Sequence, residues 1–184
     1  MLITKKILVF TATYNEKDNI GKLIELIKRY YPFVDILIVD DKSPDNTADE
    51  VRFLQKKFEN ILLIERKSKL GLDTAHKLAY KYSLENNYDY LITMDADLSH
   101  DPAELTNFFN NLEIYPFVIG SRYVHGGKCL MKMQRLLMSK YGNKLIKLVL
   151  GINCNEFTTS YRGFNLKKLG SFNLETVNAS GYSF

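Results

Sequence analysis

The sequence predicts an α/β fold in which a mostly parallel central sheet is flanked by helices, and three observations support this prediction. Short runs rich in Ile, Val, Leu and Tyr alternate with segments of helical period, which is the pattern of successive strand–helix–strand units. The runs are apolar almost throughout, as expected for strands that are covered on both faces. The chain has 184 residues, of which 46% are hydrophobic and 25% charged, and this suits one globular domain.

Six strands are expected, five from clear signals and one from a weaker signal. The clear runs are residues 7–11, 36–39, 61–65, 90–94 and 117–121, and the weaker run is 160–165. Apolar residues at helical spacing predict core-facing helices around residues 20–27, 51–58 and 75–82. Asp101 followed by Pro102 indicates the start of a fourth helix that runs to residue 112. A fifth helix, from about residue 130 to 150, places leucines and a tyrosine on one side and lysines on another.

The charge pattern argues against a nucleic-acid partner and points to one basic segment. The net charge of +4, from 25 Lys and Arg against 21 Asp and Glu, is too small to predict nucleic-acid binding. Segment 126–155 carries no Asp or Glu and six cations: Lys128, Lys132, Arg135, Lys140, Lys144 and Lys147. The longest apolar runs have only four residues, whereas a membrane-spanning helix needs about 20. The N-terminus lacks a secretory pattern, so a cytoplasmic location is expected.

The strongest functional signal is the D-x-D motif Asp95-Ala96-Asp97, which follows the fourth strand. Ligands of open α/β sheets gather beyond the carboxyl ends of the strands. In an extended segment the side chains at i and i+2 point the same way, so two carboxylates can face one site while Ala96 packs away. Oxygen ligands favour Mg²⁺ or Mn²⁺, which complete their shells with water and substrate phosphates. A diphosphate-bound metal is therefore predicted here, and the alternative is a solvated acidic turn.

Polar residues after the first two strands suggest a nucleoside site. Asp40 and Asp41 follow the second strand and could accept hydrogen bonds from a ribose or a base. They could equally initiate a turn, because the residues that follow are typical turn formers, and both interpretations stay open. After the first strand, Tyr14 offers a ring face for a base and Glu16 offers an acceptor. Asn15 and Glu16 could equally cap the first helix.

Taken in order, these segments resemble the family 2 glycosyltransferases. The resemblance rests on TYNE (13–16), VDDKSPDNT (39–47), KLGLDTA (69–75), MDADLSHDPAEL (94–105) and GSRY (120–123), and it extends from about residue 7 to 184. The nearest branch is dolichyl-phosphate or polyprenyl-phosphate mannosyltransferase, which has the GT-A fold. The resemblance implies an inverting transfer of a sugar, typically mannose from GDP-mannose, to a polyprenyl phosphate with Mg²⁺ or Mn²⁺.

The resemblance also implies roles for individual residues. Nucleotide-sugar binding is assigned to Ala12, Tyr14, Glu16, Val39, Asp41, Asp95, Ala96, Asp97 and Arg122. Metal binding is assigned to Asp95, Asp97 and Ser99, and catalysis to Asp97 and Arg122. The acceptor phosphate is assigned to Arg135, Ser139 and Arg162. In the segment EFTTSYRGF, Glu156, Ser160 and Arg162 stand at the polar positions of the family's motif.

Three departures from the family pattern affect these expectations. Ala12 stands where a proline is usual, a change expected to be mild, and Asp73 stands where a glycine is usual, so its side chain and negative charge could alter the donor preference. The chain stops at Phe184, where the family continues with an arginine and a lysine for the donor phosphates. The expectation is one glycosyltransferase catalytic domain, 1–184, shortened at its C-terminus.

The acceptor separates the leading hypothesis from its alternatives. A phosphate monoester has a second pKa of about 6, so it can attack without a general base. A sugar-hydroxyl acceptor in polysaccharide or glycolipid assembly would need a base, for which Glu156 is the lone local candidate. A third alternative is a non-catalytic nucleotide-sugar-binding fragment that needs a further segment or partner chain.

The expected partners follow from the leading hypothesis. They are a nucleotide-sugar donor, a polyprenyl-phosphate lipid, a membrane surface and a membrane-anchoring partner subunit, with no nucleic acid. The basic segment 126–155 is expected to attract anionic headgroups, which would make the protein peripheral on the cytoplasmic face of a membrane. The alternative for that segment is a soluble helix with a solvated lysine face and a buried leucine face.

Overall fold

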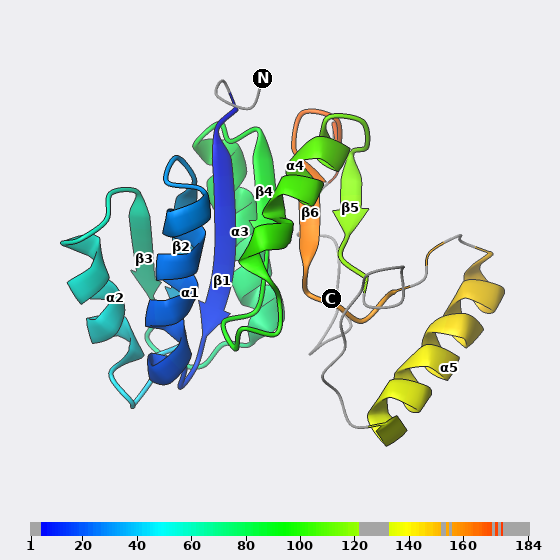
Figure 1. The fold of residues 1–184 in the computed structure, drawn as a ribbon, viewed down its shortest axis with the longest axis horizontal. Helices are drawn as coiled ribbons and strands as arrows, with labels where there is room; N and C mark the ends of the chain where they lie inside the picture. Colours follow the sequence, from blue (N-terminus) through cyan, green and yellow to red (C-terminus); the bar gives the residue numbers. More distant parts are fainter. Residues whose placement is uncertain are drawn as a thin grey trace.

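The protein is built around a twisted sheet of six strands in the order β3-β2-β1-β4-β6-β5 (Figure 1). The computed structural model describes residues 5–121, 133–151, 154, 156–170, 172 and 174, without the side chains of 133–138, 140 and 150. The strands are β1 (Ile7–Thr13), β2 (Asp35–Asp40), β3 (Ile61–Glu65), β4 (Tyr90–Thr93), β5 (Phe117–Ile119) and β6 (Arg162–Asn165). Strands β3, β2, β1 and β4 pair in parallel, whereas β6 is antiparallel to β4 and β5. The predicted mostly parallel sheet is confirmed.

The helices lie where the apolar periodicity predicts them. They are α1 (Lys17–Tyr30), α2 (Thr47–Gln55), α3 (Leu72–Glu85), α4 (Leu105–Leu112) and α5 (Met133–Leu150). The fourth predicted helix begins one turn later than expected, because Pro102–Glu104 forms a short 3-10 helix, η2. The Asp101 carboxylate caps this turn by accepting a hydrogen bond from the Ala103 amide at 3.0 Å. Residues 130–132, predicted as the start of the fifth helix, lie outside the described residues.

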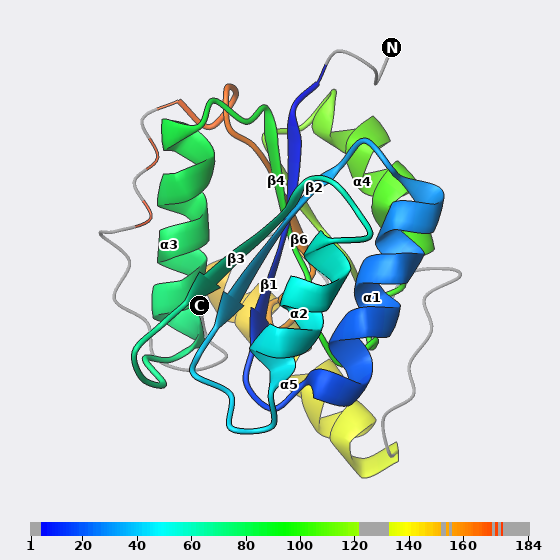
Figure 2. The ribbon, with the colours of Figure 1, turned by 90° about the vertical axis from the view of Figure 1, so that its left-hand side faces the viewer.

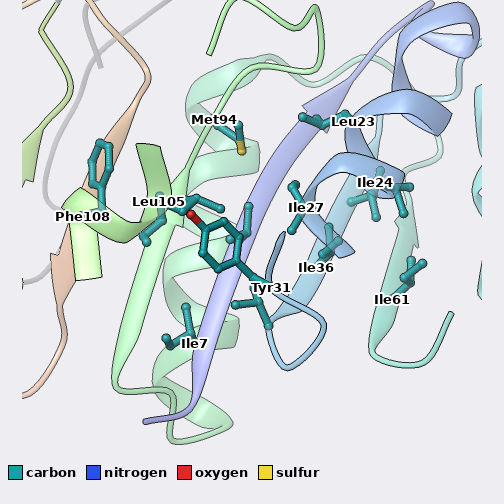
Figure 3. Packing of buried hydrophobic residues seen from close by; sticks show 14 of the residues in the cluster. Ile7, Leu23, Ile24, Ile27, Tyr31, Ile36, Ile61, Met94, Leu105 and Phe108 are labelled. Atoms are coloured by element: carbon teal, nitrogen blue, oxygen red, sulfur yellow. The ribbon is translucent and has the colours of Figure 1, made fainter. Parts of the chain in front are cut away.

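Helices cover both faces of the sheet, which explains the apolar strands. Figures 1 and 2 show α1, α2 and α4 on one face and α3 on the other. Successive side chains of a strand point to opposite faces, so Ile7 and Val9 of β1 pack in one cluster and Leu8 and Phe10 in the other. Figure 3 shows the first cluster, in which Ile27 of α1 lies against the sheet. A one-residue shift would reverse this assignment, so the register of β1 is well determined.

Helix α5 lies to one side of the sheet, toward the edge at which β6 begins (Figure 1). Its Asn143 side chain is buried and accepts a hydrogen bond from the Phe157 amide at 2.9 Å, which ties the helix to the segment before β6. None of the helices in the described ranges is both long and apolar enough to cross a membrane.

Candidate functional site

Three loops that carry predicted site residues meet at one edge of the sheet. Strand β1 lies between β2 and β4 and is parallel to both, so the carboxyl ends of the three strands are adjacent. Thr13 pairs with Asp40, and Phe10 pairs with Thr93. The topology therefore brings the β1–α1 loop, the β2–α2 loop and the D-x-D segment together, as the sequence predicts.

The β1–α1 and β2–α2 loops are joined by a ladder of hydrogen bonds. Three consecutive backbone amides of the first loop donate to side-chain oxygens of the second: Asn15 to Ser43 at 3.0 Å, Glu16 to Thr47 at 3.0 Å and Lys17 to Asp45 at 3.1 Å. These amides precede α1, and protein oxygens already satisfy them. The start of α1 is therefore a structural joint rather than a phosphate cradle.

Glu16 does not cap α1 through its side chain, so that interpretation is wrong. It occupies the N-cap position, but its carboxylate makes no capping hydrogen bond there. Instead, Glu16 accepts a hydrogen bond from the Asn19 side chain at 2.8 Å. The half-buried carboxylate lies at the rim of the loop, where the other predicted role, as an acceptor for a ligand, stays a prediction.

The two adjacent aspartates after β2 do different things. Asp40 is buried and accepts hydrogen bonds from the Thr13 hydroxyl at 2.8 Å and from the Ser43 amide at 2.8 Å, so the turn interpretation is correct for Asp40. Asp41 turns the other way and forms a buried ion pair with Arg66. Asp41 therefore organises the loop between β3 and α3.

This loop, residues 66–71, forms one wall beside Tyr14. The amides of Leu70 and Gly71 donate to Asp41 Oδ2 at 3.2 and 3.3 Å, which fixes the loop against the end of β2. Lys69 then lies over the Tyr14 ring, with its Nζ 3.8 Å from the ring centroid. The ring is 39% exposed and keeps surface available for stacking. The wall thus consists of the Tyr14 ring and the Lys69 cation, and the buried Asp41 carboxylate fixes the loop that carries Lys69.

Two of the predicted nucleotide-sugar residues, Val39 and Ala12, lie within strands of the sheet rather than in the loops that follow them. Val39 is fully buried between β1 and β3, and its side chain packs in the α3-side core. Ala12 is half-buried and packs against the same core. Any contact of Val39 with a ligand would therefore come from beneath the site, through the strand that positions Asp40 and Asp41.

The D-x-D pair lies in a turn rather than on a strand, which corrects the predicted geometry. β4 ends at Thr93, and the chain then turns, with Leu98 at a φ of 63°. The Ser99 amide donates to Asp97 Oδ1 at 3.0 Å and closes the turn. Ala96 is buried while Asp97 is exposed. Ala96 therefore packs away from the carboxylates, as expected, but a turn rather than an extended strand places it there.

Asp95 is held by residues that sequence reasoning did not single out for this task. The Ser160 hydroxyl donates to Asp95 Oδ1, and the Asp95 amide donates to Nδ1 of His100 at 2.9 Å. The sequence pattern did not predict the contact of His100 with Asp95. No periodicity or spacing rule marks a histidine five residues after an aspartate, so the sequence offered no signal for it.

Arg162 lies on the same side of the site as Asp95. Burial lowers the pKa of its guanidinium, and the negative charge of Asp95 partly offsets that shift. Its Nε donates to the Thr159 carbonyl at 2.8 Å, which uses one of its five N–H donors. A half-buried cation is thus placed beside the D-x-D turn.

The donor atoms at the turn fit a hard divalent cation. Asp95 and Asp97 contribute carboxylates and Ser99 a hydroxyl, all of them oxygen ligands. Among the residues that the structure describes, no three His, Cys, Asp or Glu side chains cluster as a metal site. Two carboxylates with few further protein ligands suit Mg²⁺ or Mn²⁺, which retain positions for water and substrate phosphates.

The predicted acceptor residues are only partly described. Ser139 of α5 is half-buried, and its hydroxyl accepts a hydrogen bond from the Asn143 side chain at 3.5 Å. Asn143 also accepts a hydrogen bond from the Phe157 amide, and the Phe157 carbonyl accepts one from Arg162 at 3.5 Å. Ser139 and Arg162 therefore belong to one hydrogen-bonded network. Arg122 and the side chain of Arg135 lie outside the described residues.

Comparison of the sequence with models of protein families identifies the family. The family model described as glycosyl transferase family 2 matches residues 8–171. The chain belongs to glycosyl transferase family 2. It is thus a glycosyltransferase, and the predicted family is confirmed.

Two curated proteins are similar to nearly the whole chain. The polyprenol monophosphomannose synthase of Mycolicibacterium smegmatis is 34% identical over 186 residues, covering 98% of this chain and 69% of the relative. The undecaprenyl-phosphate mannosyltransferase of Micrococcus luteus is 32% identical over 180 residues, covering 97% of this chain and 74% of the relative.

Two solved structures of other enzymes share the fold. Glucosyl-3-phosphoglycerate synthase from Mycobacterium tuberculosis, solved with Mn²⁺ and UDP, superposes with a TM-score of 0.69 at 16% identity over 98% of this chain. A mannosyltransferase from Pyrobaculum calidifontis, solved with GDP-Man and Mn²⁺, gives a TM-score of 0.58 at 19% identity over 93% of this chain. This chain spans 62% and 48% of those two chains, respectively. The predicted GT-A fold is confirmed.

Proposed function

We propose that this glycosyltransferase transfers mannose from GDP-mannose to the phosphate of a polyprenyl lipid, using Mn²⁺ or Mg²⁺. The observation that carries the proposal is the oxygen-ligand turn of Asp95 and Asp97, which opens on the same sheet edge as the Tyr14 ring. Two further findings support it. The curated relatives are named for mannosyl transfer to polyprenyl phosphates, and a structural neighbour was solved with GDP-Man and Mn²⁺.

The nucleoside would bind at the wall of Tyr14 and Lys69. The Tyr14 ring offers a stacking face, and Lys69 lies over part of it, so the base would share or displace that contact. Asp41 would act here chiefly by holding loop 66–71, since Arg66 and two amides already engage its carboxylate. Glu16 would complete the rim. Ala12 and Val39 would support the site from the strands below.

The donor diphosphate would lie at the D-x-D turn. Asp95, Asp97 and Ser99 would hold the divalent cation, which, when bound, supplies positive charge to the leaving diphosphate. Ala96 packs away from that surface and leaves room for it. Arg122, which lies outside the described residues, is proposed to assist at the same phosphates.

The acceptor site is proposed to include Arg135, Ser139 and Arg162. A phosphate acceptor is already largely dianionic at neutral pH and needs cations rather than a base. Glu156, the candidate base for a hydroxyl acceptor, is fully buried and accepts hydrogen bonds from Thr158 at 2.8 Å and Asn143 at 3.3 Å. That environment suits a structural carboxylate, so the phosphate acceptor is favoured over the hydroxyl alternative.

Helix α5 is proposed to rest on the membrane that holds the lipid acceptor. Leu145 and Leu148 are 61% and 79% exposed, so the alternative of a buried leucine face is not supported for this part of the helix. Lys144 is exposed beside them. Exposed apolar side chains next to a lysine suit an anionic headgroup region. The cytoplasmic membrane face, a membrane-anchoring partner and the single shortened domain stay predictions.

The metal site is tested by thermal shift with GDP, UDP and their mannose and glucose conjugates, with and without Mn²⁺. GDP and GDP-mannose should raise the melting temperature more when Mn²⁺ is present. In Asp97→Ala this metal-dependent increment should vanish, whereas Glu59→Ala, an exposed carboxylate in another turn, should retain it. An undiminished increment in Asp97→Ala would move the metal elsewhere. Metal-dependent binding without mannose transfer to a polyprenyl phosphate would favour the non-catalytic alternative.

The membrane proposal is tested by liposome flotation with anionic and neutral lipids. The protein should float with anionic vesicles, and the double variant Leu145→Glu, Leu148→Glu should remain at the bottom. Phe53→Glu, which changes an exposed aromatic residue on α2, is the matched control and should float normally. Absence of the unchanged protein from both lipid fractions would contradict the proposal.

A further inference from the structure

His100 closes the D-x-D turn onto its own starting residue. Its Nδ1 accepts the hydrogen bond of the Asp95 amide at 2.9 Å, five residues earlier in the chain. Its other ring nitrogen, Nε2, lies 3.7 Å from Asp95 Oδ2. One imidazole therefore contacts both the backbone and the carboxylate of the same aspartate. Asp97, by comparison, is positioned through the Ser99 amide within the turn.

The hydrogen bonds determine which nitrogen carries the proton in the neutral ring. Nδ1 accepts from an amide, so it must present a lone pair, and the proton belongs on Nε2. From there the N–H is directed at the region between Asp95 Oδ2 and the Thr159 hydroxyl, which is 3.5 Å away. The ring thus presents a positive edge to the carboxylate while it holds the amide.

Packing leaves the imidazole little freedom to turn. The ring is buried and stacked on Tyr161, with a centroid distance of 4.7 Å and an interplanar angle of 14°. Tyr161 is itself packed against Phe108 at 4.3 Å and donates a hydrogen bond to the Asp101 carbonyl at 3.0 Å. A ring clamped in this way fixes the orientation of whatever it bonds.

Ser160 restrains the other side of the same carboxylate. Its hydroxyl donates to Asp95 Oδ1, while its carbonyl accepts from Thr93 at the end of β4. Asp95 is therefore held at its amide, at Oδ1 and near Oδ2, although its side chain is still 38% exposed. A carboxylate that is exposed to water does not need these contacts to satisfy its oxygens. The contacts therefore serve to fix the orientation of the Asp95 side chain.

We propose that His100 is a positioning residue, which fixes Asp95 so that its carboxylate and that of Asp97 converge on the divalent cation. The inference rests on the proposed metal site at these two aspartates. Without the Nδ1 contact the turn would still close through Ser99, but the Asp95 amide would lose its acceptor and the carboxylate its orientation. Loss of such an outer contact typically weakens metal affinity by about 10- to 100-fold.

The test is a Mn²⁺ titration in the presence of GDP, following free Mn²⁺ by electron paramagnetic resonance. His100→Ala should weaken Mn²⁺ binding by about 10- to 100-fold. His100→Asn places an amide oxygen at the position of Nδ1 and should restore most of the affinity. His100→Gln places its amide one bond further out and should behave like the alanine variant. Ser83→Ala removes a buried hydroxyl on the distant part of α3 and serves as the control for general destabilisation.

The outcomes separate this inference from the proposed function. If the unchanged protein shows no Mn²⁺-dependent GDP binding, the proposed metal site is wrong. If it does, and His100→Ala binds Mn²⁺ as tightly as the unchanged protein, only the role of His100 is overturned. If His100→Ala does not fold, the asparagine and glutamine variants carry the comparison. In the unchanged apoprotein, ring ¹⁵N spectra should show the proton on Nε2, and a proton on Nδ1 would overturn the inference independently.

Discussion

A second histidine, His76 of α3, is held neutral beneath the site. Its ring is buried and packs edge-on against Phe10 of β1, with centroids 5.1 Å apart. Burial lowers its pKa to about 3, the positive charge of Arg162 contributes in the same direction, and Asp73 opposes them. Charging this imidazole would place a second cation next to Arg162. Its neutral form therefore avoids electrostatic repulsion with that guanidinium.

This imidazole makes folding stability depend on pH in a defined direction. The folded-state pKa is depressed below the unfolded value of 6.5, so the full stability contribution exists above pH 6.5 and declines as the pH falls toward 3. From about pH 7.5 to about pH 5.5, one such group should lower the free energy of unfolding by about 1.4 kcal/mol. In urea unfolding over this pH range, the free energy of unfolding of His76→Gln should fall less than that of the unchanged protein, and the difference should equal this amount. Equal losses in both proteins would mean that the imidazole is charged when folded.

Single residues show which parts of the site local sequence can predict. Asp95 and Asp97 could be singled out as candidates because both carboxylates directly follow an apolar strand. The neighbours Asp40 and Asp41 were not separable, because their roles depend on partners elsewhere in the chain: Thr13 for one, and Arg66 for the other. His100 was missed for a related reason, since its contacts with Tyr161 and with the Asp95 amide are tertiary contacts that no periodicity predicts.

At the scale of elements, β6 is the strand whose formation depends most on its surroundings. Its sequence gives a weak strand signal because it contains Gly163, which has no side chain to pack. The glycine is required by α4, since a Cβ there would lie 2.8 Å from Phe108 and 3.1 Å from Leu112. Strand β6 is inserted between β4 and β5 in antiparallel direction, an arrangement that the run of apolar residues could not specify.

Two glycine substitutions should therefore have opposite effects. Gly163→Ala should lower the free energy of unfolding by about 1–3 kcal/mol, because Phe108 is itself packed against Tyr161 and cannot yield freely. Gly142→Ala, in the interior of α5, should raise it by about 0.5–1 kcal/mol, because the added Cβ meets no described atom within 4 Å. Both values follow from urea unfolding at one pH. Stabilisation by Gly163→Ala would show that α4 is not tightly packed on β6.

At the scale of the molecule, the fold separates two tasks that one reaction needs. Strands β1, β2 and β4 place the proposed donor residues at one edge of the sheet, and the sequence order of strands and loops sufficed to predict this. The proposed acceptor residues come from α5 and from the segment leading into β6, which are distant in sequence. Their connection runs through Asn143, whose buried side chain contacts Glu156 and Phe157, and no pattern in the sequence indicates it.

Asn143 should therefore link the acceptor side to the donor side without contacting the donor. In Asn143→Ala the Phe157 amide loses its acceptor, and α5 loses its fixed position relative to the segment that carries Ser160 and Arg162. Mn²⁺-dependent GDP binding should be retained, because the turn of Asp95 and Asp97 keeps its own contacts. Mannose transfer to a polyprenyl phosphate should fall by up to about 100-fold, since small displacements of reacting groups are that costly.

The measurement pairs a thermal-shift titration of GDP and Mn²⁺ with a transfer assay on the same preparation. Gly142→Ala, one residue away on α5, is the control and should retain both activities. A parallel loss of binding and transfer in Asn143→Ala would contradict the separation, because it would show that Asn143 supports the whole fold rather than the docking of α5. Selective loss of transfer would establish that the two halves of the site are built independently and joined by this one buried amide.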